Sequence, residues 1–320
     1  MNRAKTPTIL GLIAVAAMTS PATAADDPRY DRKPDVIYGR KFGTALTMDV
    51  FTPKNDAKGV GVILVVSGGF FSSHAAISPA FIRPLIARGY TVFAVVHGSQ
   101  PRYQVTEIID DLNRAVRFIR HNAHDYHIDP ARIGVTGASA GGHLSLMLGT
   151  AGTAGNPNAS DPVDRESSRV QAVACFFPPT DFLNFGEPGR KLIHPTDHAP
   201  PFRAAFDYHE LDPGSRLWVP VTDDTKLESI ARRISPAYHV SADDPPTLII
   251  HGDKDPLVPL QQSERITDEL KKAGVPNRLI VKPGAGHGWL TMNQDLPTFL
   301  DWFDQHLSTP APSKSTNSNH

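Results

Sequence analysis

The stretch Gly137-Ala-Ser-Ala-Gly141 constrains the fold of this 320-residue chain more than any other. An apolar run at residues 133–136 precedes it, and a segment rich in Ala, Leu and Met at 140–148 follows it. This is the context of a G-x-S-x-G turn, which joins a buried strand to a helix and lifts a serine hydroxyl above the edge of a sheet. Glycines two residues either side of Ser139 are needed because the strand and helix backbones pass too close for a Cβ atom. The simpler alternative is an ordinary glycine-rich turn, so the rest of the chain must supply chemical partners for Ser139.

The alternation of apolar runs with amphipathic segments predicts an α/β fold. Eight strands are expected, at residues 35–38, 45–51, 61–66, 91–96, 133–136, 170–177, 245–251 and 277–281. Helices are expected at residues 81–87, 108–122, 140–148, 225–233, 262–273 and 296–307. The first two strands read as an antiparallel hairpin around Gly43, whereas the last six alternate with helices. That alternation predicts a mostly parallel, doubly wound sheet with helices on both faces.

Residues 182–234 interrupt the alternation and are expected to form a cap insertion within a domain that spans residues 25–307. A long irregular segment inside a compact domain is usually functional or disordered. The aromatic content of this one argues against disorder: it holds Phe182, Phe185, Phe202, Phe206, Tyr208 and Trp218. The alternative is a structural excursion that merely covers the edge of the sheet.

Both ends of the chain are expected to lie outside the fold. A positive start with Arg3 and Lys5, a short apolar run at 9–18 and the small residues Ala22-Thr-Ala24 are typical of a secretory signal. Cleavage of residues 1–24 near Ala24 predicts a secreted or periplasmic protein without a stable membrane anchor, and an uncleaved anchor is the alternative. The tail at 308–320 is rich in Ser, Pro and Asn and is expected to be disordered.

Composition excludes several classes of function. The formal net charge is −1 and the chain has no basic run, which argues against a nucleic-acid partner. The single cysteine, Cys175, lies in an apolar run, so no intramolecular disulfide can form and the residue is expected to be a small core side chain. No cluster of His, Cys or carboxylate residues has the spacing of a metal site, so neither a metal nor another cofactor is expected. The oligomeric state is left open.

Two later loops carry the partners that a serine nucleophile requires. A serine hydroxyl needs a base, and the base needs an acid that orients it. His287 is the expected base, because the glycines on both sides of it let the loop hold the imidazole over the sheet edge. Asp255, just beyond the strand at 245–251, is the expected acid. Asp253 sits inside the turn and is expected to cap backbone N–H groups instead.

The chain has fourteen histidines, so position has to decide between them. Only His287 combines a glycine-rich loop with the chain order Ser, Asp, His that belongs to this type of turn. His143 lies inside the helix after the serine and His251 at the end of a buried strand, and both are expected to be structural.

A tetrahedral intermediate also needs two backbone N–H donors for its oxygen anion. Ala140, directly after the nucleophile, is expected to supply one. The loop after the third strand is expected to supply the other, from Gly69 or Phe70. Phe71 and Trp289, which adjoin the two site loops, are candidates for substrate binding.

Together, the G-x-S-x-G turn, Gly68-Gly69, His251-Gly-Asp-Lys-Asp255 and Gly286-His287-Gly288 resemble the α/β-hydrolase superfamily. The similarity is greatest to esterases grouped with hormone-sensitive-lipase-like enzymes and with bifunctional feruloyl/acetyl-xylan esterases, and the general pattern covers residues 35–307. The resemblance implies a serine carboxylic-ester hydrolase that forms an acyl-enzyme, needs no cofactor and uses Ser139, Asp255 and His287 as its triad. The chain departs from the family pattern at Ser67, where the family loop has His. The identity of the second oxyanion donor and the close subfamily therefore stay open.

Three functions remain in contention. The first is an esterase for short-acyl or aryl esters, with acetyl or feruloyl groups on polysaccharide as the substrates that the resemblance favours. The second is a peptidase, because residues 251–259 also resemble the prolyl-oligopeptidase group, although the chain has no room for that group's N-terminal propeller. The third is a non-catalytic binding protein, which normally lacks a member of the triad, whereas this chain has all three.

Overall fold

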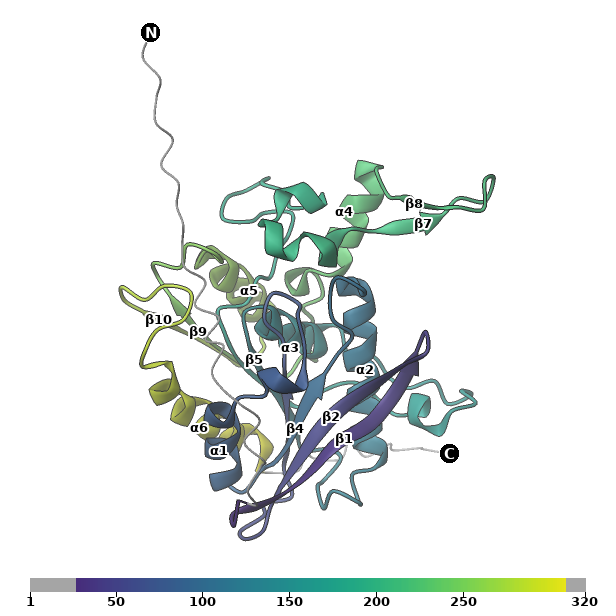
Figure 1. Cartoon of the computed structure of the whole chain (residues 1–320). Coiled ribbons are helices and arrows are strands. Elements are labelled where there is room, and N and C mark those ends of the chain that lie inside the picture. The colour runs from purple at the N-terminus through teal and green to yellow at the C-terminus, as the bar shows by residue number, and fades with distance from the viewer. Residues whose placement is uncertain (1–26, 309–320) are drawn as a thin grey trace, which may run out of the picture.

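The structure, a computed structural model, describes residues 27–308, and its centre is an eight-stranded sheet in the order β1-β2-β4-β3-β5-β6-β9-β10 (Figure 1). The strands are β1 (Tyr30–Lys41), β2 (Thr44–Pro53), β3 (Gly61–Val65), β4 (Thr91–Val96), β5 (Ile133–Ala138), β6 (Ala172–Phe176), β9 (Thr247–Gly252) and β10 (Asn277–Lys282). The β1–β2 and β2–β4 pairs are antiparallel, and all the other pairs are parallel. The predicted fold class is therefore confirmed. The predicted secretory signal, and the tail from residue 309 onward, lie outside the described residues.

Helices cover both faces of the sheet. They are α1 (Pro79–Ala87), α2 (Val105–His121), α3 (Ala140–Thr150), α5 (Gln261–Lys272) and α6 (Leu296–Leu307), with α4 (Asp224–Arg233) outside the sheet layers. The apolar residues of α1 and α6 share one core cluster, and those of α2, α3 and α5 share the other. Within residues 27–308, none of the helices is both long and apolar enough to span a membrane.

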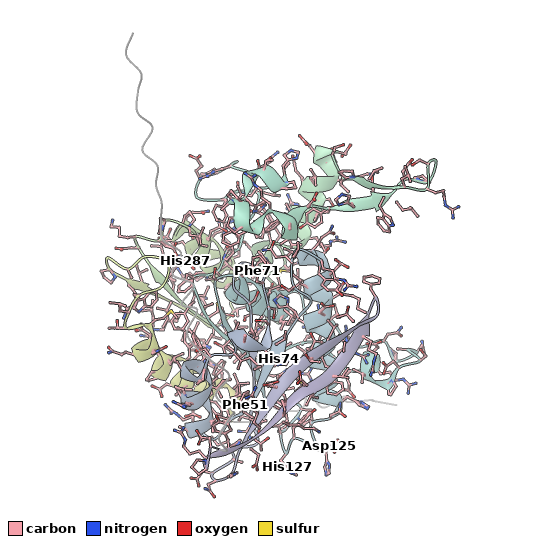
Figure 2. The ribbon with its side chains drawn as sticks, in the orientation of Figure 1. Phe51, Phe71, His74, Asp125, His127 and His287 are labelled. Atoms are coloured by element: carbon pink, nitrogen blue, oxygen red, sulfur yellow. The ribbon has the colours of Figure 1, made fainter. Side chains whose placement is uncertain are left out.

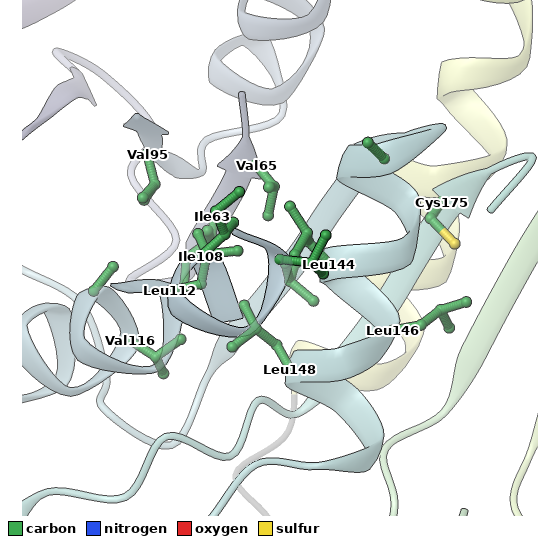
Figure 3. Packing of buried hydrophobic residues seen from close by; sticks show 14 of the residues in the cluster. Ile63, Val65, Val95, Ile108, Leu112, Val116, Leu144, Leu146, Leu148 and Cys175 are labelled. Atoms are coloured by element: carbon green, nitrogen blue, oxygen red, sulfur yellow. The ribbon is translucent and has the colours of Figure 1, made fainter. Parts of the chain in front are cut away.

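Strand β3 shows why the central strands are apolar along their whole length. Side chains alternate between the two faces of a strand. Val62 and Leu64 belong to the cluster with α1 and α6, whereas Ile63 and Val65 belong to the cluster with α2 and α3. Figure 3 shows Ile63 and Val65 packed among side chains of those two helices. A strand buried on both faces has no solvent-facing position for a polar residue.

Cys175 lies in the same core cluster and is fully buried (Figure 3). Burial raises the pKa of its thiol well above the usual value, so the thiolate that would be needed for nucleophilic chemistry is suppressed. The residue is a core side chain, as its apolar neighbours in the sequence predict.

The long segment between β6 and β9 contributes a separate layer above the sheet (green in Figure 1). It contains the 3-10 helices η3 (Pro195–Asp197) and η4 (Pro200–Phe206), the hairpin β7 (His209–Leu211) and β8 (Trp218–Pro220), and helix α4. The helix is close to its predicted bounds, whereas the hairpin was not predicted. The remaining 3-10 helices are η1 (His74–Ala76), η2 (Pro162–Arg165), η5 (Pro236–Tyr238) and η6 (Met292–Asp295).

Candidate active site

Strand β5 meets helix α3 at Ser139, whose backbone has φ of 55° and ψ of −120°. A Cβ atom on Gly137 would lie 2.5 Å from the Gly141 carbonyl oxygen, and one on Gly141 would lie 2.8 Å from the Val65 carbonyl oxygen. Only glycine fits at these two positions. The Ser139 N–H donates to the Phe176 carbonyl at 3.0 Å, which ties the turn to the neighbouring strand. The strained conformation of Ser139 is therefore fixed by its surroundings, as is usual where strain serves a site.

A continuous chain of hydrogen bonds connects the three residues that the sequence singles out. The Ser139 Oγ atom lies 2.9 Å from His287 Nε2, and His287 Nδ1 lies 2.8 Å from Asp255 Oδ2. A carboxylate only accepts, so His287 Nδ1 carries the proton and Nε2 is free to accept from the serine hydroxyl. Figure 2 shows His287 at the end of the sheet that faces the cap.

Asp255 is held as a charged acceptor on every side. Its Oδ1 atom accepts from the backbone N–H groups of Leu257 and Val258, both at 2.9 Å. Its Oδ2 atom contacts His251 Nε2 at 3.3 Å as well as His287, and the side chain is fully buried. Burial opposes ionisation, but the hydrogen bonds from His251 and His287 outweigh it and hold the pKa of Asp255 well below its usual range.

The rival carboxylate, Asp253, has a different role. Its Oδ1 atom accepts from the Gly284 N–H at 2.7 Å, so it ties the turn after β9 to the loop that carries His287.

The contact of His251 with Asp255 was not predicted. His251 Nδ1 pairs with the Ser263 hydroxyl at 2.6 Å, and Nε2 lies 2.9 Å from the Val258 carbonyl oxygen. Nε2 is therefore the donor nitrogen, and the carboxylate is its more distant neighbour at 3.3 Å. The place of His251 at the end of β9, four residues before Asp255, is the sequence feature that could have indicated this.

His143, the other histidine expected to be structural, is completely buried in α3. Its Nε2 atom lies 2.6 Å from the Ile234 carbonyl oxygen. Burial lowers the pKa of His143 to about 4, so the ring is neutral near neutral pH.

The loop after β3 forms a tight turn in which both central residues have positive φ, 55° for Gly69 and 66° for Phe70. The N–H of Phe71 donates to the Gly68 carbonyl at 3.0 Å and is therefore occupied. Among residues 27–308, neither the Gly69 nor the Phe70 N–H has an acceptor. Gln100 holds the turn from outside, with its backbone N–H donating to the Phe70 carbonyl at 3.2 Å.

A pocket of about 190 Å³ opens beside Ser139. Gly69, Phe70 and Ala140 line it next to the serine. As the first residue of α3, Ala140 has an N–H with no partner inside the helix. The other lining residues come mostly from the cap and mix aromatic with charged and aliphatic side chains: Phe182, Phe185, Arg190, Leu192, Asp197, His198, Ala199, Phe202 and Phe206. Residues of the aromatic insertion thus share this pocket with Ser139.

Phe71 and Trp289, the two candidate substrate-binding residues, are not part of this pocket's wall. Phe71 is 46% exposed (Figure 2), whereas Phe70 before it is 4% exposed and turned inward. The Trp289 Nε1–H donates to Asp295 Oδ2 at 2.8 Å, and the ring packs edge-on against Phe177 beneath His287. A role for either side chain in substrate binding stays a prediction.

Residues 48–270 match the family model BD-FAE. The chain belongs to the BD-FAE family. It is 30% identical over 268 residues to esterase LipC of Mycobacterium tuberculosis, and this match covers 82% of this chain and 60% of LipC. It is 28% identical over 249 residues to the probable carboxylic ester hydrolase LipM of the same organism, which covers 76% of this chain and 52% of LipM. The chain thus spans little more than half the length of these two relatives.

Among solved structures, a truncated carbohydrate esterase from gut microbiota superposes with a TM-score of 0.72 at 26% sequence identity, and the match covers 89% of this chain and 99% of that one. Together with the family match, this similarity places the BD-FAE chain in the α/β-hydrolase superfamily. The predicted resemblance to that superfamily is confirmed.

The sequence predicts no metal site in this BD-FAE chain. Among the described residues, one trio of possible ligands lies close together: Asp35, Asp49 and His74. Figure 2 shows His74 apart from His287, beside the β1–β2 hairpin. His74 Nδ1 lies 2.9 Å from Asp49 Oδ1, and Arg32 Nε donates to Asp49 Oδ2 at 2.9 Å. The guanidinium thus supplies the positive charge that the buried carboxylate requires.

Proposed function

We propose that this protein hydrolyses carboxylic esters through an acyl-enzyme formed on Ser139, with Asp255 and His287 completing the triad. The observation that carries the proposal is the unbroken hydrogen-bond chain from Ser139 Oγ through His287 to the buried Asp255, beside a pocket with free backbone donors. Membership of the BD-FAE family and the likeness to esterases support the same reaction class.

In the proposed first half-reaction, Ser139 Oγ attacks the ester carbonyl carbon while its proton passes to His287 Nε2. The Ala140 N–H, together with that of Gly69 or Phe70, donates to the developing oxygen anion. His287 then returns the proton to the leaving alcohol oxygen as the carbon–oxygen bond breaks. In the second half, His287 removes a proton from water, which attacks the acyl carbonyl carbon. The bond between that carbon and Ser139 Oγ then breaks, Oγ takes the proton back from His287, and the acid is released.

Asp255 acts through His287 and does not itself exchange a proton in this scheme. Its low pKa keeps it ionised while His287 is transiently positive, so the ion pair stabilises the charge that appears during proton transfer. The hydrogen bonds from Leu257 and Val258 to the other carboxylate oxygen fix the orientation in which Asp255 meets His287.

The substrates we propose are short-acyl or aryl esters, with acetyl or feruloyl groups on polysaccharide as the natural case. The aromatic residues of the pocket wall and the likeness to a solved carbohydrate esterase support this choice. We also propose that the protein is secreted or periplasmic, because residues 1–24 have the pattern of a cleaved secretory signal. Polymeric substrates of this kind occur outside the cell that uses them.

A substrate panel tests the proposed reaction. It contains 4-nitrophenyl acetate, a feruloyl ester, an acetylated sugar and a peptide 4-nitroanilide, each assayed with the wild type and with Ser139→Ala. Hydrolysis of the esters that vanishes in Ser139→Ala, while the amide is cleaved poorly, supports the proposal. Amide turnover above ester turnover, after correction for intrinsic reactivity, would favour the peptidase alternative. No turnover of any substrate by folded wild type would favour the binding protein.

A further inference from the structure

The turn after β3, which lines the pocket beside Ser139, is held in a conformation that its sequence does not favour. Its central residues, Gly69 and Phe70, have φ of 55° and 66°. The Phe71 N–H closes the turn by donating to the Gly68 carbonyl at 3.0 Å. Positive φ at both central positions defines a type I′ turn. Such a φ suits glycine but strains Phe70, because its Cβ atom comes too close to the following carbonyl oxygen.

A type II′ turn would close the same loop without that strain. It keeps the closing hydrogen bond and the positive φ of the first central residue, Gly69, but gives the second a negative φ. The two turn types differ by a rotation of the central peptide group, here the Gly69 carbonyl and the Phe70 N–H. This rotation leaves the side chains almost in place, so the edge-on packing of the Phe70 ring on Phe206 does not oppose it. An interaction from outside the turn must therefore favour type I′.

Gln100 supplies such an interaction. Its Nε2 atom donates to the Gly69 carbonyl, and its backbone N–H donates to the Phe70 carbonyl at 3.2 Å. Of these two bonds, only the one from the side chain holds the central peptide group, since the Phe70 carbonyl belongs to the next group. The amide cannot have the reverse orientation, because its oxygen would then face the Gly69 carbonyl oxygen with no proton between them. A rotated peptide group would lose the bond from Nε2.

The surroundings of the Gln100 amide indicate that this bond is the reason for a polar residue here. Gln100 is 3% exposed, and its Oε1 atom is buried without a hydrogen-bond partner among residues 27–308. An unpaired buried oxygen costs free energy, which an apolar residue of the same shape would avoid. Gln100 does not line the pocket beside Ser139, so it acts through the turn rather than on a substrate.

The orientation of the central peptide group decides what the turn presents to the pocket. The carbonyl and the N–H of a trans peptide point in opposite directions. Because the Gly69 carbonyl points to Gln100, the Phe70 N–H points away from Gln100, on the side where Phe70 lines the pocket with Ser139. In the rotated form the Gly69 carbonyl oxygen would take the place of this N–H and would repel an oxygen anion.

We propose that Gln100 is a positioning residue for the oxyanion hole: its side-chain amide holds the turn at 68–71 in the type I′ form, which directs the Phe70 N–H toward the oxygen anion. The inference rests on the proposed ester hydrolysis and names Phe70 as the donor that Gln100 controls. The Gly69 N–H belongs to the peptide group whose carbonyl Phe71 holds, so its direction does not depend on Gln100.

Gln100→Met tests the inference, because methionine has a similar length and shape but no N–H donor. Loss of one oxyanion donor should lower both kcat and kcat/KM on 4-nitrophenyl acetate by about 100-fold. The inhibition constant of phenylboronic acid, whose adduct on Ser139 carries an oxygen in the same place, should rise by a similar factor. Gln171→Met is the matched control and should leave both values unchanged. Its Oε1 atom accepts from the Ile133 N–H at 3.1 Å, at the opposite end of β5 from Ser139.

An NMR measurement follows the same peptide group without any substitution. Phe70 is the only phenylalanine in the sequence that follows a glycine. Isotope labels on the glycine carbonyl carbons and the phenylalanine nitrogens therefore give a single coupled signal. In the wild type, phenylboronic acid should move the Phe70 amide proton downfield, because the N–H begins to donate to a charged oxygen. In Gln100→Met the signal should lie elsewhere and should not respond.

Unchanged kcat in Gln100→Met would overturn the inference, and so would a Phe70 signal that stays in place when phenylboronic acid saturates the wild type. A fall in kcat without a rise in the inhibition constant would also overturn it and would assign Gln100 a structural role only. These outcomes leave the proposed ester hydrolysis intact, provided that the wild type cleaves 4-nitrophenyl acetate. A folded wild type that cleaves no ester would overturn both proposals.

Discussion

Replacing Asp255 by Asn should lower kcat by about four orders of magnitude, because the substitution reverses the direction of one hydrogen bond. In the native site, Oδ2 accepts from His287 Nδ1 at 2.8 Å. An amide NH₂ group in its place can only donate, so His287 would have to accept at Nδ1 and carry its proton on Nε2. Nε2 could then no longer accept the proton of Ser139.

A flipped amide does not restore the native arrangement. If the Asn oxygen faced His287, the NH₂ group would face the backbone N–H groups of Leu257 and Val258, which both donate to Oδ1 in the native protein. Three donors would then meet without an acceptor. The unflipped form is therefore the stable one, and about four orders of magnitude correspond to about 5 kcal/mol of lost transition-state stabilisation.

Asp253→Asn is the matched control, two residues away on the same turn. An Asn oxygen can still accept from the Gly284 N–H that Asp253 binds at 2.7 Å, so kcat should stay within about threefold of the wild type. The assay is steady-state hydrolysis of 4-nitrophenyl acetate at about pH 7, with thermal melting to show that both variants are folded. The account of the site is wrong if Asp255→Asn keeps more than about a tenth of the activity, or if Asp253→Asn loses more than Asp255→Asn does.

Three further predictions concern the scaffold. Gly137→Ala places a Cβ atom 2.5 Å from the Gly141 carbonyl oxygen and should cost at least about 3 kcal/mol of stability, measured by denaturant unfolding; a cost below about 1 kcal/mol would contradict this. Burial raises the pKa of the Cys175 thiol, so Cys175 should resist iodoacetamide at about pH 8 in the folded protein and react fully in urea. Labelling of the native state would refute its burial. Burial lowers the pKa of His97 and His143 to about 4, below the unfolded value of about 6.5, so the unfolded state takes up protons first as pH falls. Acidification from about pH 7 to 5 should therefore lower the free energy of unfolding by about 2 kcal/mol per histidine, and no change over that window would contradict the assignment.

The sheet was predictable from the sequence because its central strands are buried on both faces and so appear as continuous apolar runs. Strand β1 runs over Tyr30–Lys41, well beyond its predicted span. Its first half is polar, contains Pro34 and is largely exposed, so its pairing with β2 depends on the partner strand and leaves no apolar pattern.

The proposed triad could also be predicted from the sequence, because the carboxyl ends of parallel strands share one edge of the sheet and each candidate residue follows a strand. The arrangement of side chains within the cap could not be predicted from the sequence. His198 lies in a segment without periodicity, and its burial depends on Phe206 and on contacts made only in the folded chain. The sequence also does not indicate that Phe70 and Phe71 differ in burial, because the difference accompanies the positive φ of Phe70, which leaves one of these neighbouring side chains buried and the other exposed.

The identity of the nucleophile is tested most directly by covalent labelling. The folded protein is treated with a fluorophosphonate, the adduct is located by peptide mass mapping, and ester hydrolysis is followed on the same sample. A single adduct on Ser139 that forms in step with the loss of activity, and that is absent from Ser139→Ala and slowed in His287→Ala, is the predicted result. Loss of activity with the label on another residue, or ester hydrolysis that persists at full rate in Ser139→Ala, would contradict the account.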